Sequence, residues 1–249
     1  MVERRSILLV ANGIGEPHDS NHFGRQKTEV TIDTNADREL LQSSRAEQTL
    51  AKKQRVLDVA RSQFVHHGYR AATMEMIAQV SGVSKRSLYL WHTDKPALFK
   101  ACLVDGALRF PVLRFDPNAD VEEDLLAFGV ALLMELARPG SIGFGALLIR
   151  EAREFPQLAE LARRNREQYL VQPLADYLYE AGLADNNGRE AADLFTSLLL
   201  APIHHHLLLG HVLPDDETLA SHANRATRLF VLGQSAIVRS KKEDLDAHI

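Results

Sequence analysis

The chain has 249 residues, 45% of them hydrophobic, so it is long enough to bury a core as one large domain or two modest ones. Cys102 is its only cysteine, which excludes an intrachain disulfide, and the net charge of −4 argues against a general nucleic-acid binder. The longest apolar run, residues 194–213, is interrupted by Pro202 and four histidines and is a poor membrane span. We therefore expect a cytoplasmic protein with no membrane partner.

The charges are unevenly distributed along the chain. Residues 45–100 carry ten lysines and arginines against four aspartates and glutamates, whereas residues 101–249 carry a net −8 and residues 1–44 a net −2. A basic segment on an acidic body is expected when one end of a molecule meets phosphate. Taken alone, the same distribution also fits ordinary solvated surfaces on both halves.

Residues 1–44 show no sustained helical or strand period, and polar residues dominate from residue 16 onward. Such a segment has too little apolar surface to offset the entropy lost on folding, so we expect a mostly disordered extension.

The first predicted helix runs from about residue 44 to residue 67, and Gly68 ends it. Apolar residues recur on one face at helical spacing, namely Leu50, Leu57, Ala60 and Phe64. The basic residues near its start, which could reach a DNA backbone, are Lys52, Lys53 and Arg55.

Two short helices joined by a glycine turn follow. The hydroxyl of Thr73 can cap the first helix, and Gly82, which tolerates a positive φ, can end it. Ser84 can cap the second helix, which we expect from residue 85 to about residue 91. This pattern is typical of the helix-turn-helix, whose second helix enters the major groove with its N-terminal residues against the bases.

Several motifs occur in a fixed order between residues 55 and 103. They are Phe64, Gly68-Tyr69, Ile77-Ala78, Gly82-Val83-Ser84-Lys85, Leu88-Tyr89 and Asp94-Lys95. This ordered set resembles the N-terminal domain of the TetR family of transcriptional repressors. The chain departs from the usual family pattern at Arg86, where a small residue is common, at His92, where an aromatic is common, and at Thr93, where proline is frequent.

The second helix of the pair is the predicted DNA-reading helix. The resemblance further implies that Tyr89 and Lys95 touch phosphates, which would position the domain without reading sequence. The residues expected to contact DNA are Thr73, Ser84, Lys85, Arg86, Ser87, Tyr89, Leu90, His92 and Lys95.

A helix capped by Asp94 should run to residue 110 and lead into a second domain. Prolines and glycines then divide the chain into further helices, predicted at about residues 120–137, 142–154, 157–181, 189–209 and 216–238. Residues 149–170 also resemble the C-terminal domain of a TetR subgroup related to the AefR regulator.

The predicted fold is all-α, with about nine helices, the number that the resemblance implies. A three-helix helix-turn-helix domain is followed by a helical regulatory and dimerisation domain. The expected parts are a polar extension at 1–44, a DNA-binding domain at 45–102, a ligand-binding and dimerisation domain at 103–240, and a tail at 241–249.

The last two predicted helices look too apolar for the surface of a monomer. A two-layer core within one chain would bury them, but the resemblance implies a four-helix bundle formed by two subunits. A twofold homodimer of this kind would match a palindromic operator in double-stranded DNA. The predicted interface residues are Phe195, Leu199, Ile203, His206, Leu229, Phe230 and Ile237.

The resemblance also implies a pocket for a small hydrophobic effector. An apolar cavity between helices could be lined by side chains that would equally serve as plain core. These are Phe128, Leu132, Met134, Phe144, Leu148, Tyr169 and Tyr177.

Neither a metal site nor a catalytic site is expected. Of the clustered histidines, only His204 and His211 share a helical face, and they would lie about 10 Å apart along the axis. We expect the cluster at a subunit interface or a pocket. No nucleophile elbow, phosphate-binding loop or His-Glu-x-x-His motif occurs, so we expect no cofactor and no enzyme activity.

The leading hypothesis is a sequence-specific transcriptional regulator, a repressor released from its operator by a small molecule. One alternative is a constitutive DNA-binding dimer without an effector. The other is an all-helical metal-binding protein or enzyme that uses His204, His205 and His206.

Overall fold

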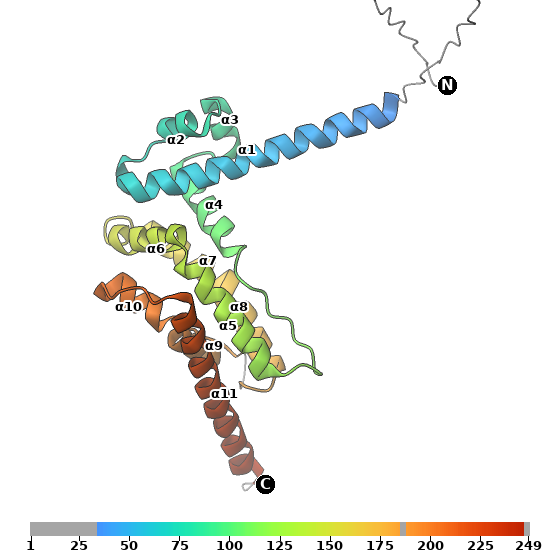
Figure 1. The fold of residues 1–249 in the computed structure, drawn as a ribbon, viewed down its shortest axis with the longest axis vertical. Helices are drawn as coiled ribbons and strands as arrows, with labels where there is room; N and C mark the ends of the chain where they lie inside the picture. The colour runs from blue at the N-terminus through green and yellow to red at the C-terminus, as the bar shows by residue number, and fades with distance from the viewer. Residues whose placement is uncertain (1–33, 185–187, 247–249) are drawn as a thin grey trace, which may run out of the picture. The chain divides into compact units, whose positions relative to one another are not determined.

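Helices account for the regular structure of the residues that the computed structural model describes, 34–184 and 188–246 (Figure 1). No strand occurs in these ranges, which confirms the predicted all-α fold. The chain divides into two units, residues 1–51 and 52–249.

The described part of the first unit is the beginning of α1 (Thr34–Ala71), where the side chains of residues 43–51 are exposed. The expected disorder of residues 1–44 lies outside the described residues up to residue 33. From Thr34 onward that prediction is wrong, because α1 begins there instead of near residue 44.

In the second unit, α1 turns one apolar face toward the core. That face begins at Val56 and continues through Ala60 and Phe64, all three fully buried, whereas Leu50 of the first unit is 69% exposed. Gly68, with φ 79° and ψ 161°, is non-helical and separates the long helix before it from a short helical turn that continues to Ala71. The predicted end of the first helix at this glycine is therefore confirmed, and α1 as a whole is kinked there.

Three shorter helices complete the N-terminal part: α2 (Met74–Ser81), α3 (Lys85–Trp91) and α4 (Lys95–Ala107). All three begin where the sequence predicts. Asp94 caps α4 by accepting a hydrogen bond from the amide of Ala97 at 2.7 Å. However, α4 ends at Ala107, before the predicted residue 110.

The middle of the chain forms α5 (Val121–Ala137), α6 (Pro139–Glu151), α7 (Pro156–Arg166), the π-helical turn η1 (Glu167–Val171) and α8 (Gln172–Glu180). The last three follow one another without a break, in agreement with the single predicted helix. No single helix in the described ranges is long and apolar enough to cross a membrane, although α5 and α6, bent by 74°, pass that test as a pair.

The C-terminal part contains α9 (Arg189–Leu199), α10 (Ala201–Leu209) and α11 (Asp216–Asp246), with α11 beside α5 and α9 (Figure 1). The sequence predicted one helix where α9 and α10 stand. Pro202 has no amide hydrogen to donate to the carbonyl of Leu198, which interrupts the helix at Leu200. With α7, η1 and α8 counted as one helix and the kinked α1 as another, the described residues therefore form ten helices, compared with about nine predicted.

A side chain from α11 closes this break. Nε2 of His222 lies 3.0 Å from the carbonyl oxygen of Leu198 and 3.2 Å from that of Leu199. The imidazole thus meets acceptors that the interrupted helix leaves unbonded.

The buried apolar side chains form two clusters. The first joins α5, η1, α8, α9, α10 and α11, with the fully buried Leu132, Phe195 and Leu219 among its members. The second joins α1 to α4 and also takes Phe144, Leu147 and Leu158 from α6 and α7. The core beneath the helix-turn-helix therefore extends into the segment predicted to belong to the other domain.

Candidate DNA-binding site

Local hydrogen bonds fix the turn between α2 and α3. The hydroxyl of Thr73 accepts from the amide of Met76 at 3.2 Å, and that of Ser84 accepts from the amide of Ser87 at 3.0 Å. Gly82 adopts φ 73° and ψ 22°, the left-handed conformation expected for a residue that stops a helix. The predicted caps and the predicted glycine turn are confirmed.

Only one side of α3 is buried. Leu88 is fully buried, while Lys85 and Arg86 are exposed, Tyr89 is 43% exposed and Leu90 is 80% exposed. The structure therefore turns most of the predicted reading residues toward solvent, as access to DNA requires. Ser87 and His92 are partly buried, and the hydroxyl of Thr73 faces its own helix as a cap.

The exposed cations differ in their surroundings. Nζ of Lys85 lies 3.9 Å from a carboxylate oxygen of Glu75 on α2, a weak ion pair between exposed groups. Among the residues that the structure describes, no carboxylate pairs with Arg86. At the other end of α3, the ammonium of Lys53 lies 5.8 Å from the centre of the Trp91 ring. Burial, followed by the charge of Lys53, lowers the pKa of His92.

Lys95 has partners that the sequence did not predict. Its Nζ donates to the carbonyl oxygens of Tyr69, Arg70 and Ala72 at 2.8, 3.0 and 3.1 Å, and it lies 4.6 Å from the centre of the Tyr69 ring. These acceptors can occupy all three hydrogens of the ammonium. Burial lowers the pKa of Lys95. Its phosphate contact stays a prediction, but in this structure the side chain closes the carbonyl end of α1.

The segment between α6 and α7 touches the same end of α1. The guanidinium of Arg70 pairs with Glu154 and lies 5.8 Å from the centre of the Phe155 ring. The rings of Tyr69 and Phe155 meet edge to face with their centroids 5.0 Å apart. The C-terminal half of the chain thus contacts the helix-turn-helix part directly as well as through α4.

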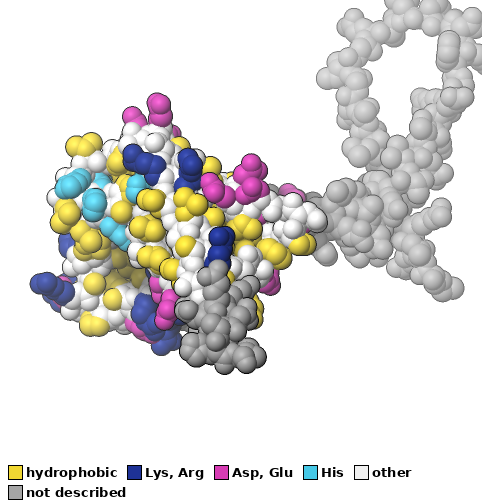
Figure 2. Space-filling model, turned by 90° about the horizontal axis from the view of Figure 1, so that it is seen from below, with side chains coloured by type: hydrophobic (Ala, Val, Ile, Leu, Met, Phe, Trp, Pro, Cys, Tyr) yellow, Lys and Arg dark blue, Asp and Glu magenta, His cyan; other side chains and the backbone are white. Residues whose placement is uncertain are grey.

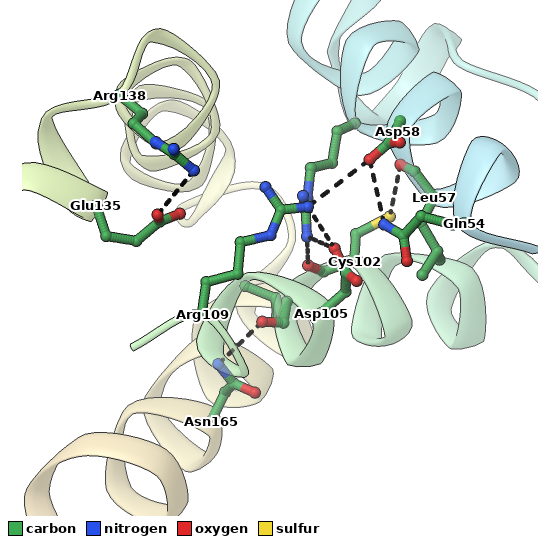
Figure 3. Close-up of polar contacts among 11 residues, drawn as sticks. Gln54, Leu57, Asp58, Cys102, Asp105, Arg109, Glu135, Arg138 and Asn165 are labelled. Atoms are coloured by element: carbon green, nitrogen blue, oxygen red, sulfur yellow. Dashed lines mark hydrogen bonds and ion pairs between the residues drawn. The ribbon is translucent and has the colours of Figure 1, made fainter. Parts of the chain in front are cut away.

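An ion-pair network ties α1 to the far end of α4 (Figure 3). Arg61 donates to the carbonyl of Cys102 at 2.7 Å and pairs with Asp105 at 2.5 Å. Arg109 pairs with the same carboxylate at 3.1 Å and approaches Asp58 to 3.8 Å. Because the shared carboxylate is only 17% exposed, water screens these contacts less than it screens a surface pair.

Two further polar contacts involve the backbone of α1 and α4 (Figure 3). Asn165 of α7 donates to the carbonyl of Leu103 at 3.3 Å. The thiol of Cys102 lies 3.7 Å from the carbonyl of Leu57, and burial raises the pKa of that thiol to about 12. This cysteine is therefore a poor nucleophile at neutral pH.

Residues 56–102 match the bacterial regulatory proteins of the tetR family, and residues 123–232 match the C-terminal domain of AefR-like transcriptional repressors. The HTH-type transcriptional regulator YvkB of Bacillus subtilis (strain 168) is 30% identical over 188 residues, which cover 73% of this chain and 96% of YvkB. The chain belongs to the TetR family. The expected resemblance is confirmed, and with it a DNA-binding helix-turn-helix regulator.

Solved TetR-family structures share the fold. The flavonoid-responsive regulator FrrA is 25% identical, with a TM-score of 0.59 over 74% of this chain and 96% of FrrA. A TetR transcriptional regulator from Agrobacterium tumefaciens is 27% identical, with a TM-score of 0.58 over 73% of this chain and 93% of that protein. These relatives support the assignment of α2 and α3 as the helix-turn-helix of a TetR-family protein.

Most of the predicted pocket residues of this TetR-family chain are divided between the two buried clusters. Leu132 and Tyr177 are buried in the first cluster and Met134 packs against it, whereas Phe144 and Leu148 belong with the second cluster. Tyr169 is partly buried in η1. A cleft of about 390 Å³ does open beside α5, and among the predicted residues only Phe128 lines it. The cleft is lined by Pro111, Val112, Leu113, Arg114, Asp124, Ala127 and Phe128.

A polar pair orients one wall of this cleft. The phenol of Tyr177 donates to Asp124 at 3.0 Å, and its ring meets Phe115 edge to face at 6.2 Å. Burial, together with the hydrogen bond and charge of Asp124, raises the pKa of Tyr177, so the phenol remains a donor.

The predicted interface residues fall into two groups. Four of them are buried in the core of the single chain, namely Phe195, Leu199, Ile203 and Phe230. Because these side chains are already covered, the prediction that they face a partner subunit is wrong. His206 is partly buried, whereas Leu229 is 68% and Ile237 48% exposed. Other exposed apolar side chains of α9 and α11 are Leu194, Leu198 and Leu232.

The clustered histidines lie together with hydrophobic side chains on one face (Figure 2). The helix ends at Leu209, as predicted, and Gly210 takes a left-handed conformation, so His204 and His211 do not share a helical face. Instead, His211 lies beside His205 with ring centroids 5.5 Å apart, and its carbonyl is 2.7 Å from Nδ1 of His206. In the described part of the chain, no three metal-binding side chains converge.

Proposed function

We propose that this TetR-family regulator is a homodimeric repressor that leaves its operator when a small hydrophobic molecule binds the C-terminal domain. The observation that carries the proposal is α3 itself, a capped helix with one buried leucine and an exposed outer face. The likeness of residues 123–232 to AefR-like repressors favours repression over activation. FrrA is a flavonoid-responsive regulator, which favours a small-molecule signal here.

Apolar exposure on α9 and α11 supports the dimer. Leu194 and Leu198 on α9 and Leu229, Leu232 and Ile237 on α11 are each between 36% and 68% exposed. Such side chains on two adjacent helices lose contact with water when a second copy packs against them. A twofold dimer then presents two α3 helices to a palindromic operator.

Release from the operator requires the ligand to bind more tightly to a dimer whose two helix-turn-helix domains no longer fit the operator. A ligand shifts the equilibrium between the DNA-bound and released arrangements only by its difference in affinity for them. The C-terminal half contacts the helix-turn-helix part through Asn165 on α4 and through Glu154 and Phe155 on the end of α1. It also shares a core with that part, which includes Phe144, Leu147 and Leu158. A rearrangement around the cleft beside α5 would be transmitted along these contacts.

The proposal is tested with the full chain and fragments of its own genome. We expect retention of a discrete promoter fragment, two protomers per palindrome, and affinity that falls steeply with salt as phosphate contacts release counterions. A screen of hydrophobic and phenolic compounds should then find ones that release the fragment and raise the melting temperature. A protein that retains no fragment at low salt would overturn the proposal, and retention that no compound relieves would favour a constitutive regulator.

A further inference from the structure

Two side chains of different chemistry, those of Arg86 and Leu90, occupy the most exposed face of α3. With about 3.6 residues per turn, Arg86 and Leu90 lie only about 40° apart around the helix axis. Both project from the side opposite the fully buried Leu88. The partly buried Ser87 and Trp91 lie on one flank, and Lys85 and Tyr89 lie on the other.

Neither side chain is engaged within the chain. Leu90 is 80% exposed and is absent from both hydrophobic clusters and from the apolar residues packed against them. In the described residues Arg86 has no ion pair, whereas the neighbouring Lys85 approaches Glu75. A single exposed leucine is ordinary on a protein surface. What distinguishes Leu90 is its place beside Arg86 on the outer face of α3, where both side chains are free to contact a partner.

Base edges in the major groove offer a partner for each. A guanidinium makes two hydrogen bonds to O6 and N7 of guanine, and an aliphatic side chain packs against the C5-methyl group of thymine. Four residues of helix span about 6 Å, which is close to two base-pair steps of about 3.4 Å.

We infer that Arg86 and Leu90 are the specificity-determining pair of this regulator, with Arg86 reading a guanine and Leu90 a thymine methyl group about two base pairs away in each half-site. The inference rests on the proposed binding of operator DNA by α3. The phosphate backbone of the DNA is contacted by Lys85, Tyr89 and the capped ends of the helices. These contacts hold α3 in the groove and contribute less to the choice of bases.

Selection of binding sites from random duplex DNA tests the pair. The wild-type protein should select a guanine and a thymine at this spacing in each half-site. Arg86→Ala should lose the guanine preference and Leu90→Ala the thymine preference, each leaving the other intact. Arg86→Lys keeps the charge but not the planar fork, so it should keep the salt dependence of binding and still lose the guanine preference.

Base analogues then probe single atoms in the selected duplex. Removing guanine N7 with 7-deazaguanine should weaken the wild-type protein about five- to a hundredfold and leave Arg86→Ala unaffected. Replacing the thymine with deoxyuridine removes one methyl group and should weaken the wild type about fourfold per half-site, but not Leu90→Ala.

Val80→Ala and Lys100→Ala are matched controls, because they remove another exposed apolar side chain and another exposed cation from neighbouring helices. Both should select the wild-type sequence. The inference is overturned if the Arg86 or Leu90 variants select that sequence too, or if the analogues weaken wild type and variant equally. A wild-type protein that selects no sequence would overturn the proposed function as well, which separates the two failures.

Discussion

Gly82 and Gly188 have similar local conformations, since each adjoins a helix and each adopts a positive φ, 73° and 68°. Their surroundings differ completely. A Cβ atom added at Gly82 would meet nothing within 4 Å, whereas one added at Gly188 would lie 2.1 Å from the carbonyl oxygen of Ala175 on α8. The first glycine is required by its own turn, and the second is also required by a helix that packs against it.

The same contrast separates the two regions around these glycines. In the α2–α3 unit the helix ends are closed by residues three or four positions away, such as Thr73 and Ser84. In the C-terminal bundle Asp120 and Asp215 also cap helices locally. The break between α9 and α10, however, is closed from far along the chain, where His222 meets the carbonyls of Leu198 and Leu199. Local patterns therefore specify the α2–α3 unit, whereas the break between α9 and α10 depends on packing against α11.

The largest effect should come from Gly188→Ala. The added methyl group overlaps a backbone carbonyl that cannot move without displacing α8, so we expect a loss of about 4 kcal/mol or more in the free energy of unfolding. Urea denaturation measures it. The matched control Gly82→Ala meets only the backbone strain of its positive φ, about 1–2 kcal/mol. Equal losses of unfolding free energy at Gly82 and Gly188 would contradict the claim that packing against α8 adds to the requirement for glycine at residue 188.

Lys95→Ala should have the next largest effect, because Lys95 of α4 makes long-range contacts with the end of α1, next to the locally capped α2–α3 unit. Its removal takes the ammonium away from three backbone carbonyls, and we expect a loss of about 2–3 kcal/mol. Lys100→Ala, an exposed lysine on the same helix, should change stability by less than about 0.5 kcal/mol. If the midpoint of urea denaturation were the same for both variants and the wild type, the contacts of Lys95 with the carbonyls at the end of α1 would not stabilise the fold.

His222→Ala should cost about 1–2 kcal/mol, since it removes a partly buried donor from the break between α9 and α10. Hydrogen exchange should also speed up at the break while the amides of α2 and α3 keep their protection relative to global unfolding. The exposed Arg225→Ala on the same helix serves as the control. Unchanged exchange in the variant would mean that Pro202 alone defines the break.

Ser84→Ala should have the smallest effect, about 1 kcal/mol, because it removes one helix cap at an exposed position. Ser84→Asp keeps an acceptor for the amide of Ser87 and should recover most of the loss. Thermal unfolding of the three proteins measures this. If the aspartate variant were no more stable than the alanine variant, the cap would not be the cause.

Sequence patterns were most informative where partners are close along the chain. The caps at Thr73, Ser84 and Asp94 were all predicted correctly, as was the turn at Gly82. Composition alone could not show that a short helical turn follows the kink at Gly68, because that depends on how the chain continues beyond the glycine.

The wrong predictions concern apolar residues that suit more than one environment. A leucine or phenylalanine on an apolar helix suits a core and a subunit interface equally, so Phe195 and Phe230 were assigned to the wrong one. The same ambiguity assigned Phe144 to a ligand cavity, although it stacks on Phe99 beneath the reading unit with centroids 5.0 Å apart. Nothing within a few residues of these positions distinguishes the alternatives.

By itself, the sequence determined the helical class, the order of most helices and the α2–α3 unit, because caps, glycine turns and apolar periods act over one or two turns of chain. Tertiary structure alone decided the split of α9 from α10 with its closure by His222, the partners of Lys95 and the extension of the second core into α6 and α7. These depend on which distant groups meet, and an unsatisfied carbonyl or an apolar face can be completed from many positions in a chain.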